Sequence, residues 1–198
     1  PRPVIKFMVD MINPSLKEKE TILDPACGTA GFLIESFKHL EKKVKGTQDN
    51  EFLQKNCLSG IEPRPEPYLF SMMNMMLHGL EEPNIARVNT LETKLSDIKE
   101  ELQHNIIMTN PPFGGEEQDS IKKKLPAGFQ TKDTALGFLL HCMSRLTEDG
   151  RCAIILPKGE LLSGLGVFFR VREKFLQECK VHTIIKLHES VFKPYAGI

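Results

Sequence analysis

The chain has 198 residues, 40% of them hydrophobic, which is enough to bury one core and too few for two full domains. Lysine plus arginine (26) equals aspartate plus glutamate (26), so global charge does not indicate a polyanionic partner, although a local patch or a partner subunit can still supply positive surface. The five cysteines form no CxxC pair and lie near no histidines at metal spacing, which indicates reduced thiols and no metal. No apolar stretch approaches the roughly 20 residues of a membrane span, and no signal pattern opens the chain, so we expect a cytoplasmic protein without a membrane partner.

Helix and strand patterns alternate through the first half of the chain. Apolar residues at helical spacing predict helices over residues 4–12, from about residue 31 onward and over residues 66–80. Short buried runs predict strands at residues 21–23 and 58–63. The polar stretch at residues 45–57 extends either the preceding helix or a loop.

The second half continues the alternation. Strands are predicted at residues 85–91, 105–109, 151–157 and 181–188, with helices at 134–146 and 167–179 and a mobile loop at 114–133. This order predicts an α/β fold with a mostly parallel sheet covered on both faces, in one catalytic domain spanning residues 1–198. Because the chain begins with proline and ends on YAGI, we expect it to be part of a longer protein.

The segment DPACGTAGF, residues 24–32, follows the first predicted strand. Gly28 and Gly31 allow a tight turn and close backbone approach, and the next helix directs its free amides toward a ligand. The segment is not GxGxxG and lacks the lysine of a P-loop, and Asp24 would repel a pyrophosphate. It suits a ligand that carries positive charge or an amino group. Taken alone, it is somewhat more typical of an ordinary strand-to-helix turn, because glycine-rich turns are common.

Glu62 ends the second predicted strand, where an acidic residue can accept hydrogen bonds from both ribose hydroxyls. It lies 31 residues after Gly31, later than the usual spacing of about 20, and the polar stretch near residues 45–56 explains the excess. A nucleoside with a cationic amino-acid tail satisfies both segments. S-adenosylmethionine is such a ligand, and we expect it as the cofactor.

The segment IIMTNPPFGG, residues 106–115, ends the fourth predicted strand. Two prolines remove two backbone donors and fix φ twice, so the chain must leave the sheet at Pro111. The Asn110 side-chain oxygen and the Pro111 carbonyl can then accept from one amino group, with Pro112 stiffening the turn and Phe113 offering a flat wall. These residues specify only a planar NH2, which leaves adenine in DNA or RNA, guanine N2 and a glutamine amide open.

The order of these segments carries a family resemblance. DPACGTAGF followed by NPPF resembles the amino-methyltransferases, and PRPVIKFMVDMI, NMMLHG, GRCAIILPKGELL and IIKLHESVFKPYAGI resemble the modification (M) subunit of type I restriction-modification systems. The resemblance implies a Rossmann-like class I methyltransferase fold with a seven-stranded sheet, and methylation of adenine N6 in DNA. It implies DNA and the specificity (S) and restriction (R) subunits as partners.

The resemblance also implies residue roles. The segment from Asp24 to Gly31 would line the methionine part of the cofactor, Phe32 would help form its pocket, and Glu62 would hold the ribose. Asn89 stands where the family usually has an aspartate that accepts from the cofactor's adenine amine, and an asparagine oxygen can still accept that bond. The implied cofactor residues are Asp24, Pro25, Ala26, Cys27, Gly28, Thr29, Gly31, Phe32, Glu62, Asn89, Thr90, Leu91 and Asn110, and the implied catalytic residues are Asn110, Pro111, Pro112 and Phe113.

The residues also indicate a mechanism. The adenine amine is a poor nucleophile because its lone pair is delocalised, and two acceptors on its hydrogens would localise that pair. A base in duplex DNA must be flipped out to reach such a cleft, where Phe113 would stack on it. The alternative from another class is a catalytically silent scaffold that keeps the cofactor pocket, against which Asp24, Glu62 and NPPF together argue. We expect His141 and Cys142 to be structural.

Overall fold

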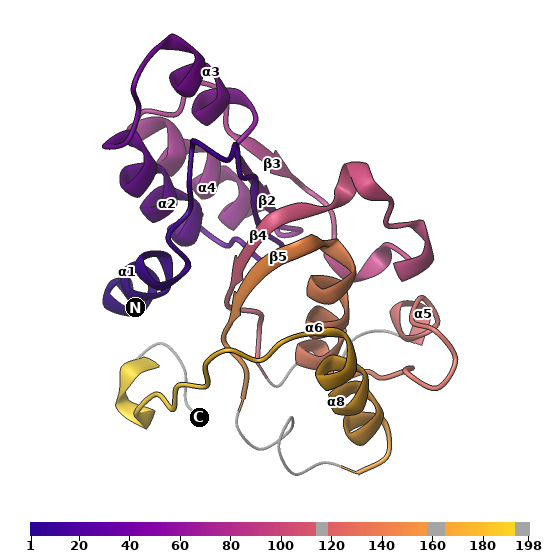
Figure 1. The fold of residues 1–198 in the computed structure, drawn as a ribbon. Coiled ribbons are helices and arrows are strands. Elements are labelled where there is room, and N and C mark those ends of the chain that lie inside the picture. Colours follow the sequence, from indigo (N-terminus) through magenta and orange to yellow (C-terminus); the bar gives the residue numbers. More distant parts are fainter. Residues whose placement is uncertain (114–118, 158–164, 193–198) are drawn as a thin grey trace.

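A parallel sheet of five strands in the order β3-β2-β1-β4-β5 forms the centre of the computed structural model, which describes residues 1–113, 119–157 and 165–192 (Figure 1). The short strand β1 is flanked by β2 and β4, and all adjacent strands pair in parallel. This confirms the predicted α/β fold. The strands are β1 (Ile22–Asp24), β2 (Leu58–Ile61), β3 (Asn84–Ala86), β4 (His104–Thr109) and β5 (Leu146–Ile154).

Helices connect these strands. None of the helices in the described ranges is both long and apolar enough to cross a membrane. The α-helices are α1 (Arg2–Ile12), α2 (Gly31–Glu41), α3 (Thr47–Lys55), α4 (Pro65–Leu77), α5 (Asp119–Lys122), α6 (Thr134–Arg145) and α8 (Val167–Glu178), and the 3-10 helices are η1 (Thr90–Glu92), η2 (Leu95–Asp97), η3 (Glu100–Leu102) and η4 (Glu189–Phe192).

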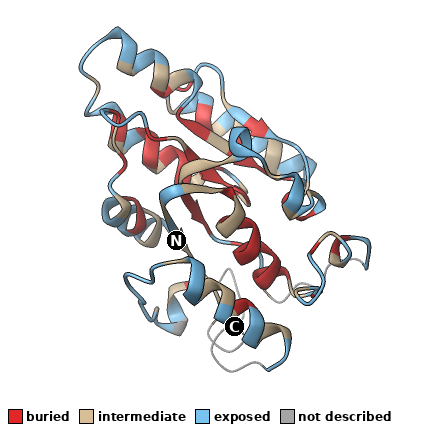
Figure 2. Cartoon of the chain, turned by 45° about the vertical axis from the view of Figure 1, so that its right-hand side comes forward, coloured by how far each residue is buried: buried red, intermediate tan, exposed pale blue. Residues whose placement is uncertain are grey.

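Successive residues of the central strands enter cores on opposite faces of the sheet. In β4, Ile106 and Met108 pack with α1–α4, whereas Ile107 packs with Leu23 and Cys142 toward α6. This alternation is the period of two that a strand imposes on its side chains. The buried residues accordingly concentrate in β1, β2 and β4 and in α2 and α6, while only Val171 of α8 is buried (Figure 2). The sheet is therefore covered on both faces, as predicted.

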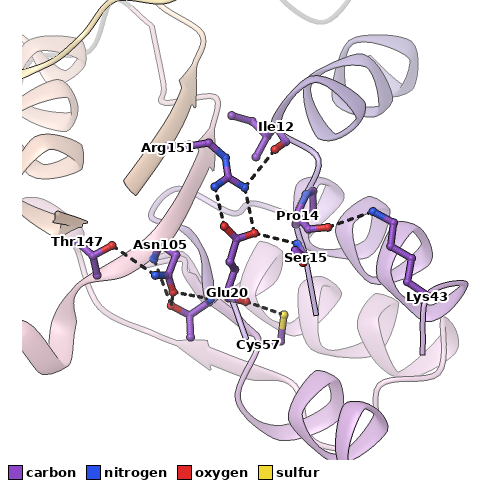
Figure 3. A network of polar contacts seen from close by, with 10 residues as sticks. Ile12, Pro14, Ser15, Glu20, Lys43, Cys57, Asn105, Thr147 and Arg151 are labelled. Carbon is purple, nitrogen blue, oxygen red and sulfur yellow. Dashed lines mark hydrogen bonds and ion pairs between the residues drawn. The ribbon is translucent and has the colours of Figure 1, made fainter. Parts of the chain in front are cut away.

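A polar network ties the amino ends of β1, β4 and β5 to the end of α1 (Figure 3). The Glu20 carboxylate accepts from the Arg151 guanidinium at 2.6 and 3.0 Å and from the Ser15 N–H at 2.8 Å, and Arg151 also donates to the Ile12 carbonyl. Burial acts to raise the pKa of Glu20, but the bonds from Arg151 and Ser15 outweigh it and hold the pKa below its ordinary value. The network joins segments that are distant in the sequence, since the two residues of the ion pair are 131 positions apart.

Several predicted boundaries were wrong. The predicted strand at residues 181–188 is not part of the sheet: these residues have no ladder partner in the described chain, and Ile184 is 80% exposed. Alternating apolar residues indicate strand propensity, but a strand also needs a partner backbone. The predicted strand at 85–91 ends at Ala86, because the Asn89 side chain caps η1 immediately afterwards. The described sheet thus has five strands, against the six predicted from the residues and the seven implied by the resemblance.

Two further boundaries differ. The fifth strand begins at Leu146 rather than residue 151. Asp149 adopts φ 61° and the register with β4 shifts there, so the residues between the predicted helix and the predicted strand join the strand. The predicted loop at 114–133 contains the short helix α5, and its residues 114–118, including Gly114 and Gly115, lie outside the described residues. The polar stretch after residue 45 forms a separate helix, α3.

Candidate active site

Three predicted site segments meet at one edge of the sheet. Asp24 is the last residue of β1, Glu62 follows the last residue of β2, and Asn110 follows the last residue of β4. Because β1 lies between β2 and β4 and all three run in parallel, their carboxyl ends lie side by side. In open parallel sheets this edge is where ligands bind.

Asp24 is a buried carboxylic acid with a strongly shifted pKa. One of its oxygens, Oδ1, accepts from the Thr109 hydroxyl at 2.8 Å and from the Ala26 N–H at 3.1 Å. Burial raises the pKa of Asp24 to about 7; these two bonds oppose the rise and the nearby charge of Glu62 adds to it. The site therefore holds an acid that exchanges its proton near neutral pH and that a ligand cation would ionise.

The loop after β1 turns sharply before α2. The Cys27 N–H donates to the Ile61 carbonyl, and the Ala30 N–H donates to the Cys27 carbonyl. Gly28 adopts φ 53°, and a Cβ built there would meet nothing within 4 Å, so its backbone faces open space. At Gly31, by contrast, a Cβ would lie 2.9 Å from Ile5, so this glycine lets α1 pack against the start of α2. The first glycine thus leaves open space beside the backbone, whereas the second allows close packing.

Glu62 connects this loop to the second strand. Its side chain is 5% exposed; Oε2 accepts from the Gly28 N–H at 3.1 Å, and Oε1 accepts from both the backbone N–H and the guanidinium of Arg64 at 3.0 Å each. The structure thus brings Glu62 to the glycine loop, as predicted. Sequence analysis missed Arg64, for which the only available signal was a cation two residues after the acid.

The segment after β3 contacts the loop after β1. It contains Asn89, Thr90 and Leu91. The Thr90 hydroxyl donates to the Pro25 carbonyl at 2.5 Å, and Leu91 is buried against Gly137 of α6. Asn89 is partly exposed, and its Oδ1 accepts from the Leu91 N–H at 3.0 Å. The amide oxygen that was expected to accept from a ligand is therefore engaged in capping η1.

The NPPF segment leaves the sheet directly beyond Thr109. Asn110 and Pro112 are exposed, whereas Pro111 is buried. Phe113 is partly exposed, and its ring packs edge-to-face on Phe192 of η4 with centroids 6.1 Å apart. The asparagine side chain thus lies at the surface beside the buried Asp24–Thr109 bond. Thr109 was also missed from the sequence, although it directly precedes the motif.

Not every predicted residue presents its side chain to this edge. Cys27 and Phe32 are buried in the core between the sheet and helices α1–α4, so only their backbone is available to a ligand. Burial raises the pKa of the Cys27 thiol well above its ordinary range, which makes it inert as a nucleophile. His141 and Cys142 are buried in α6, as expected of structural residues. No group of three or more potential metal ligands occurs among residues 1–113, 119–157 and 165–192.

Comparison with known proteins identifies the family of this chain. A family model described as N-6 DNA Methylase matches residues 1–198. The chain belongs to this family. The methylase subunit of the type I restriction enzyme EcoEI from Escherichia coli is 44% identical over 200 residues, which cover 100% of this chain and 40% of that relative. This N-6 DNA methylase chain therefore spans less than half the length of that relative.

Solved structures agree with the family assignment. A modification subunit assigned to a type I restriction enzyme of Vibrio vulnificus YJ016 superposes with a TM-score of 0.82 and 42% identity, over 89% of this chain and 37% of that one. A Listeria monocytogenes protein described as a class I S-adenosylmethionine-dependent methyltransferase superposes with a TM-score of 0.61 and 18% identity, over 87% of this chain and 50% of that one. The second likeness concerns the fold alone, which is the predicted class I methyltransferase fold.

Proposed function

We propose that this chain is the catalytic region of a type I modification subunit, which transfers a methyl group from S-adenosylmethionine to N6 of adenine in DNA. The observation that carries the proposal is the meeting of Asp24, Glu62 and Asn110 at the ends of three adjacent strands. Two hydrogen bonds join these segments, from Thr109 to Asp24 and from Gly28 to Glu62. The family membership supports the same reaction.

The residues fit the proposed cofactor. Gly28 faces open space at a positive φ, which leaves room for a ligand against the backbone. Asp24 is a buried acid without a cationic partner among its recorded contacts, and a ligand amino group would supply one. Glu62 lies beside the glycine loop, where it would accept from ribose. When bound, the cofactor supplies a methyl group activated by its positively charged sulfur.

The chain's own contribution to the reaction is to position the accepting amine. Asn110 is exposed beyond the end of β4, and its side-chain oxygen together with the Pro111 carbonyl would accept both hydrogens of the adenine amine. These bonds direct the nitrogen lone pair outward and stabilise the positive charge that develops on it. Phe113, held edge-on by Phe192, would stack on the flipped base. No covalent intermediate is needed, in keeping with the inert Cys27 thiol.

The partners follow from the same proposal. DNA is the substrate, and the specificity and restriction subunits of a type I system are the proposed protein partners, in the cytoplasm. The neutral net charge of the chain supports dependence on a partner, because the positive surface that holds DNA phosphates must come from local patches or from another subunit.

Substitution of Asn110 tests the function. In the intact protein assembled with its specificity subunit, we expect Asn110→Ala to lower methyl transfer to duplex DNA at least about 100-fold while cofactor affinity changes less than about threefold. Asn50→Ala, at an exposed position on α3, is the matched control and should leave transfer unchanged. The measurement is incorporation of labelled methyl into N6-methyladenine, followed by calorimetric titration with the cofactor.

Other results would change the proposed function. Labelling of RNA or of protein glutamine in place of DNA would change the substrate class. Cofactor binding without transfer to any acceptor would make the chain a binding scaffold. Full transfer by Asn110→Ala would contradict the mechanism.

A further inference from the structure

The Glu62 carboxylate has nearly exhausted its capacity to accept hydrogen bonds. A carboxylate offers about four lone-pair positions. Three are filled here: Gly28 N–H on Oε2, and the backbone N–H and Nε of Arg64 on Oε1. A ribose diol brings two further donors. At least one of the present donors must leave before both hydroxyls can bind to this carboxylate.

The three donors differ in how readily they can leave. The Gly28 and Arg64 N–H groups belong to the backbone of the glycine loop and of the entry to α4, so releasing either requires that segment to move. The Arg64 guanidinium, in contrast, belongs to a side chain that is 71% exposed and can rotate into solvent. Arg64 is the N-cap residue of α4, yet its side chain makes no capping bond. The helix therefore does not depend on where this side chain points.

We propose that the Arg64 side chain competes with the cofactor's ribose for Glu62 and is displaced when the cofactor binds. This inference rests on the proposed function, since it assumes that Glu62 receives the ribose. Before binding, the guanidinium neutralises a buried carboxylate that would otherwise be unpaired, which keeps Glu62 oriented beside Gly28. The cost of displacement lowers the affinity, so Arg64 sets the cofactor concentration at which the site fills.

The competition has a specific chemical signature. Removing the guanidinium frees an Oε1 lone pair for a second ribose hydroxyl. A nucleoside ligand that lacks one hydroxyl needs only one lone pair, and the position that remains on Oε2 already provides it. The substitution should therefore strengthen binding of a ribose ligand and leave binding of its deoxy analogue unchanged. A purely structural role for Arg64 would affect both ligands equally.

The experiment uses Arg64→Met, which keeps an apolar stem and removes the charge. Lys55→Met is the matched control, because Lys55 also forms an ion pair with a glutamate, Glu51, but on the exposed surface of α3. The probes are S-adenosylhomocysteine and its 2′-deoxy analogue, titrated calorimetrically into the intact protein. These ligands have an uncharged sulfur, so repulsion between Arg64 and a sulfonium does not contribute.

We expect Arg64→Met to lower the Kd for S-adenosylhomocysteine about three- to tenfold and to change the Kd for the deoxy analogue less than twofold. Lys55→Met should change neither value. Weaker or unchanged binding of the ribose ligand by Arg64→Met, or equal strengthening of both ligands, would overturn the competition while leaving the cofactor assignment intact. Absence of binding by the wild-type protein would overturn the proposed function, and the competition with it. Arg64→Gln provides a second variant, and circular dichroism verifies that each is folded.

Discussion

At the scale of single residues, we expect Asp24 to make cofactor binding depend on pH. The pKa of its buried carboxyl lies at about 7 in the unliganded site, whereas a cationic ligand requires the ionised form. Below pH 7 binding must displace a proton, so affinity for S-adenosylmethionine should fall about tenfold for each unit that the pH drops. Above about pH 8 this dependence should vanish. Calorimetric titrations between pH 5.5 and 8.5, a range set about one and a half units around that pKa, would measure the slope.

Asp24→Asn provides the control for this dependence. The amide keeps an oxygen that can accept from Thr109 and Ala26 but does not titrate. Its affinity should be lower than that of the wild type at pH 8 and flat across the same range. A slope that survives in Asp24→Asn would assign the titration to another group, such as the ligand's own amine.

Asn89 carries a second prediction at this scale. Because its oxygen already accepts from the Leu91 N–H, only the second lone pair of that oxygen is left to accept from an adenine amine. Asn89→Asp would keep the cap with one oxygen and offer the other to the ligand. We expect the Kd for S-adenosylmethionine to fall about three- to tenfold, as measured by calorimetry.

Two outcomes would separate capping from ligand contact at this position. Asn89→Ala removes both the cap of η1 and the proposed contact with the ligand, so it should lower thermal stability without improving affinity for the cofactor. If Asn89→Asp bound the cofactor no better than the wild type, the side chain at this position would not reach the adenine amine, and its role would be limited to starting η1.

At the scale of elements, the Glu20–Arg151 pair holds the amino end of β1 and the middle of β5 to the end of α1 (Figure 3). Glu20→Gln should lower the free energy of unfolding at pH 7 by about 2 kcal/mol, because it weakens charge-assisted bonds to a buried group while Arg151 stays partly hydrated. Urea denaturation measures this loss. Glu51→Gln, which affects only an exposed pair, should cost less than about 0.5 kcal/mol.

The pH dependence of this stabilisation has a defined sign. The pKa of Glu20 is lowered on folding from its ordinary value of 4.5, so its stabilising effect is complete above that value and is lost as the pH falls through the lower folded pKa. The difference between wild type and Glu20→Gln should therefore shrink when the denaturation is repeated below about pH 4. A difference that remained constant would mean that the glutamine disrupts packing rather than charge.

Sequence periodicity predicted the elements of the central sheet better than those at its margins. The runs around Ile22, Leu58 and Ile107 are buried on both sides by covalently adjacent helices, so local pattern and final environment agree. Residues 181–188 have a similar pattern but no partner strand in the described chain, and η1 begins where a side-chain cap at Asn89 ends the predicted strand. Pairing and capping depend on neighbours that a local pattern does not contain.

At the scale of the whole molecule, chain order and parallel pairing were sufficient to predict which motifs meet. The segments after β1, β2 and β4 converge although up to 85 residues separate hydrogen-bonded partners, here Asp24 and Thr109. The bonds within the site were not predictable in the same way. The local sequence does not indicate that Thr109 donates to Asp24, or that the Arg64 side chain donates to Glu62. Both bonds depend on side-chain rotamers that form only in the assembled sheet.

The strand β1 is only three residues long, yet it is held at both ends. Just before it, the Thr21 N–H donates to Asn105, and at its last residue Asp24 accepts from Thr109, so β4 holds it at both ends. Releasing the start of the glycine loop would require the Asp24–Thr109 bond to break, and with it the pairing of β1 and β4 at the centre of the sheet. The outer turn of the loop, by contrast, is held to β2 through the Gly28 N–H on the Glu62 carboxylate and the Cys27 N–H on the Ile61 carbonyl. A ligand that binds at this turn would therefore meet an acid whose position is set by the same strand that carries Asn110.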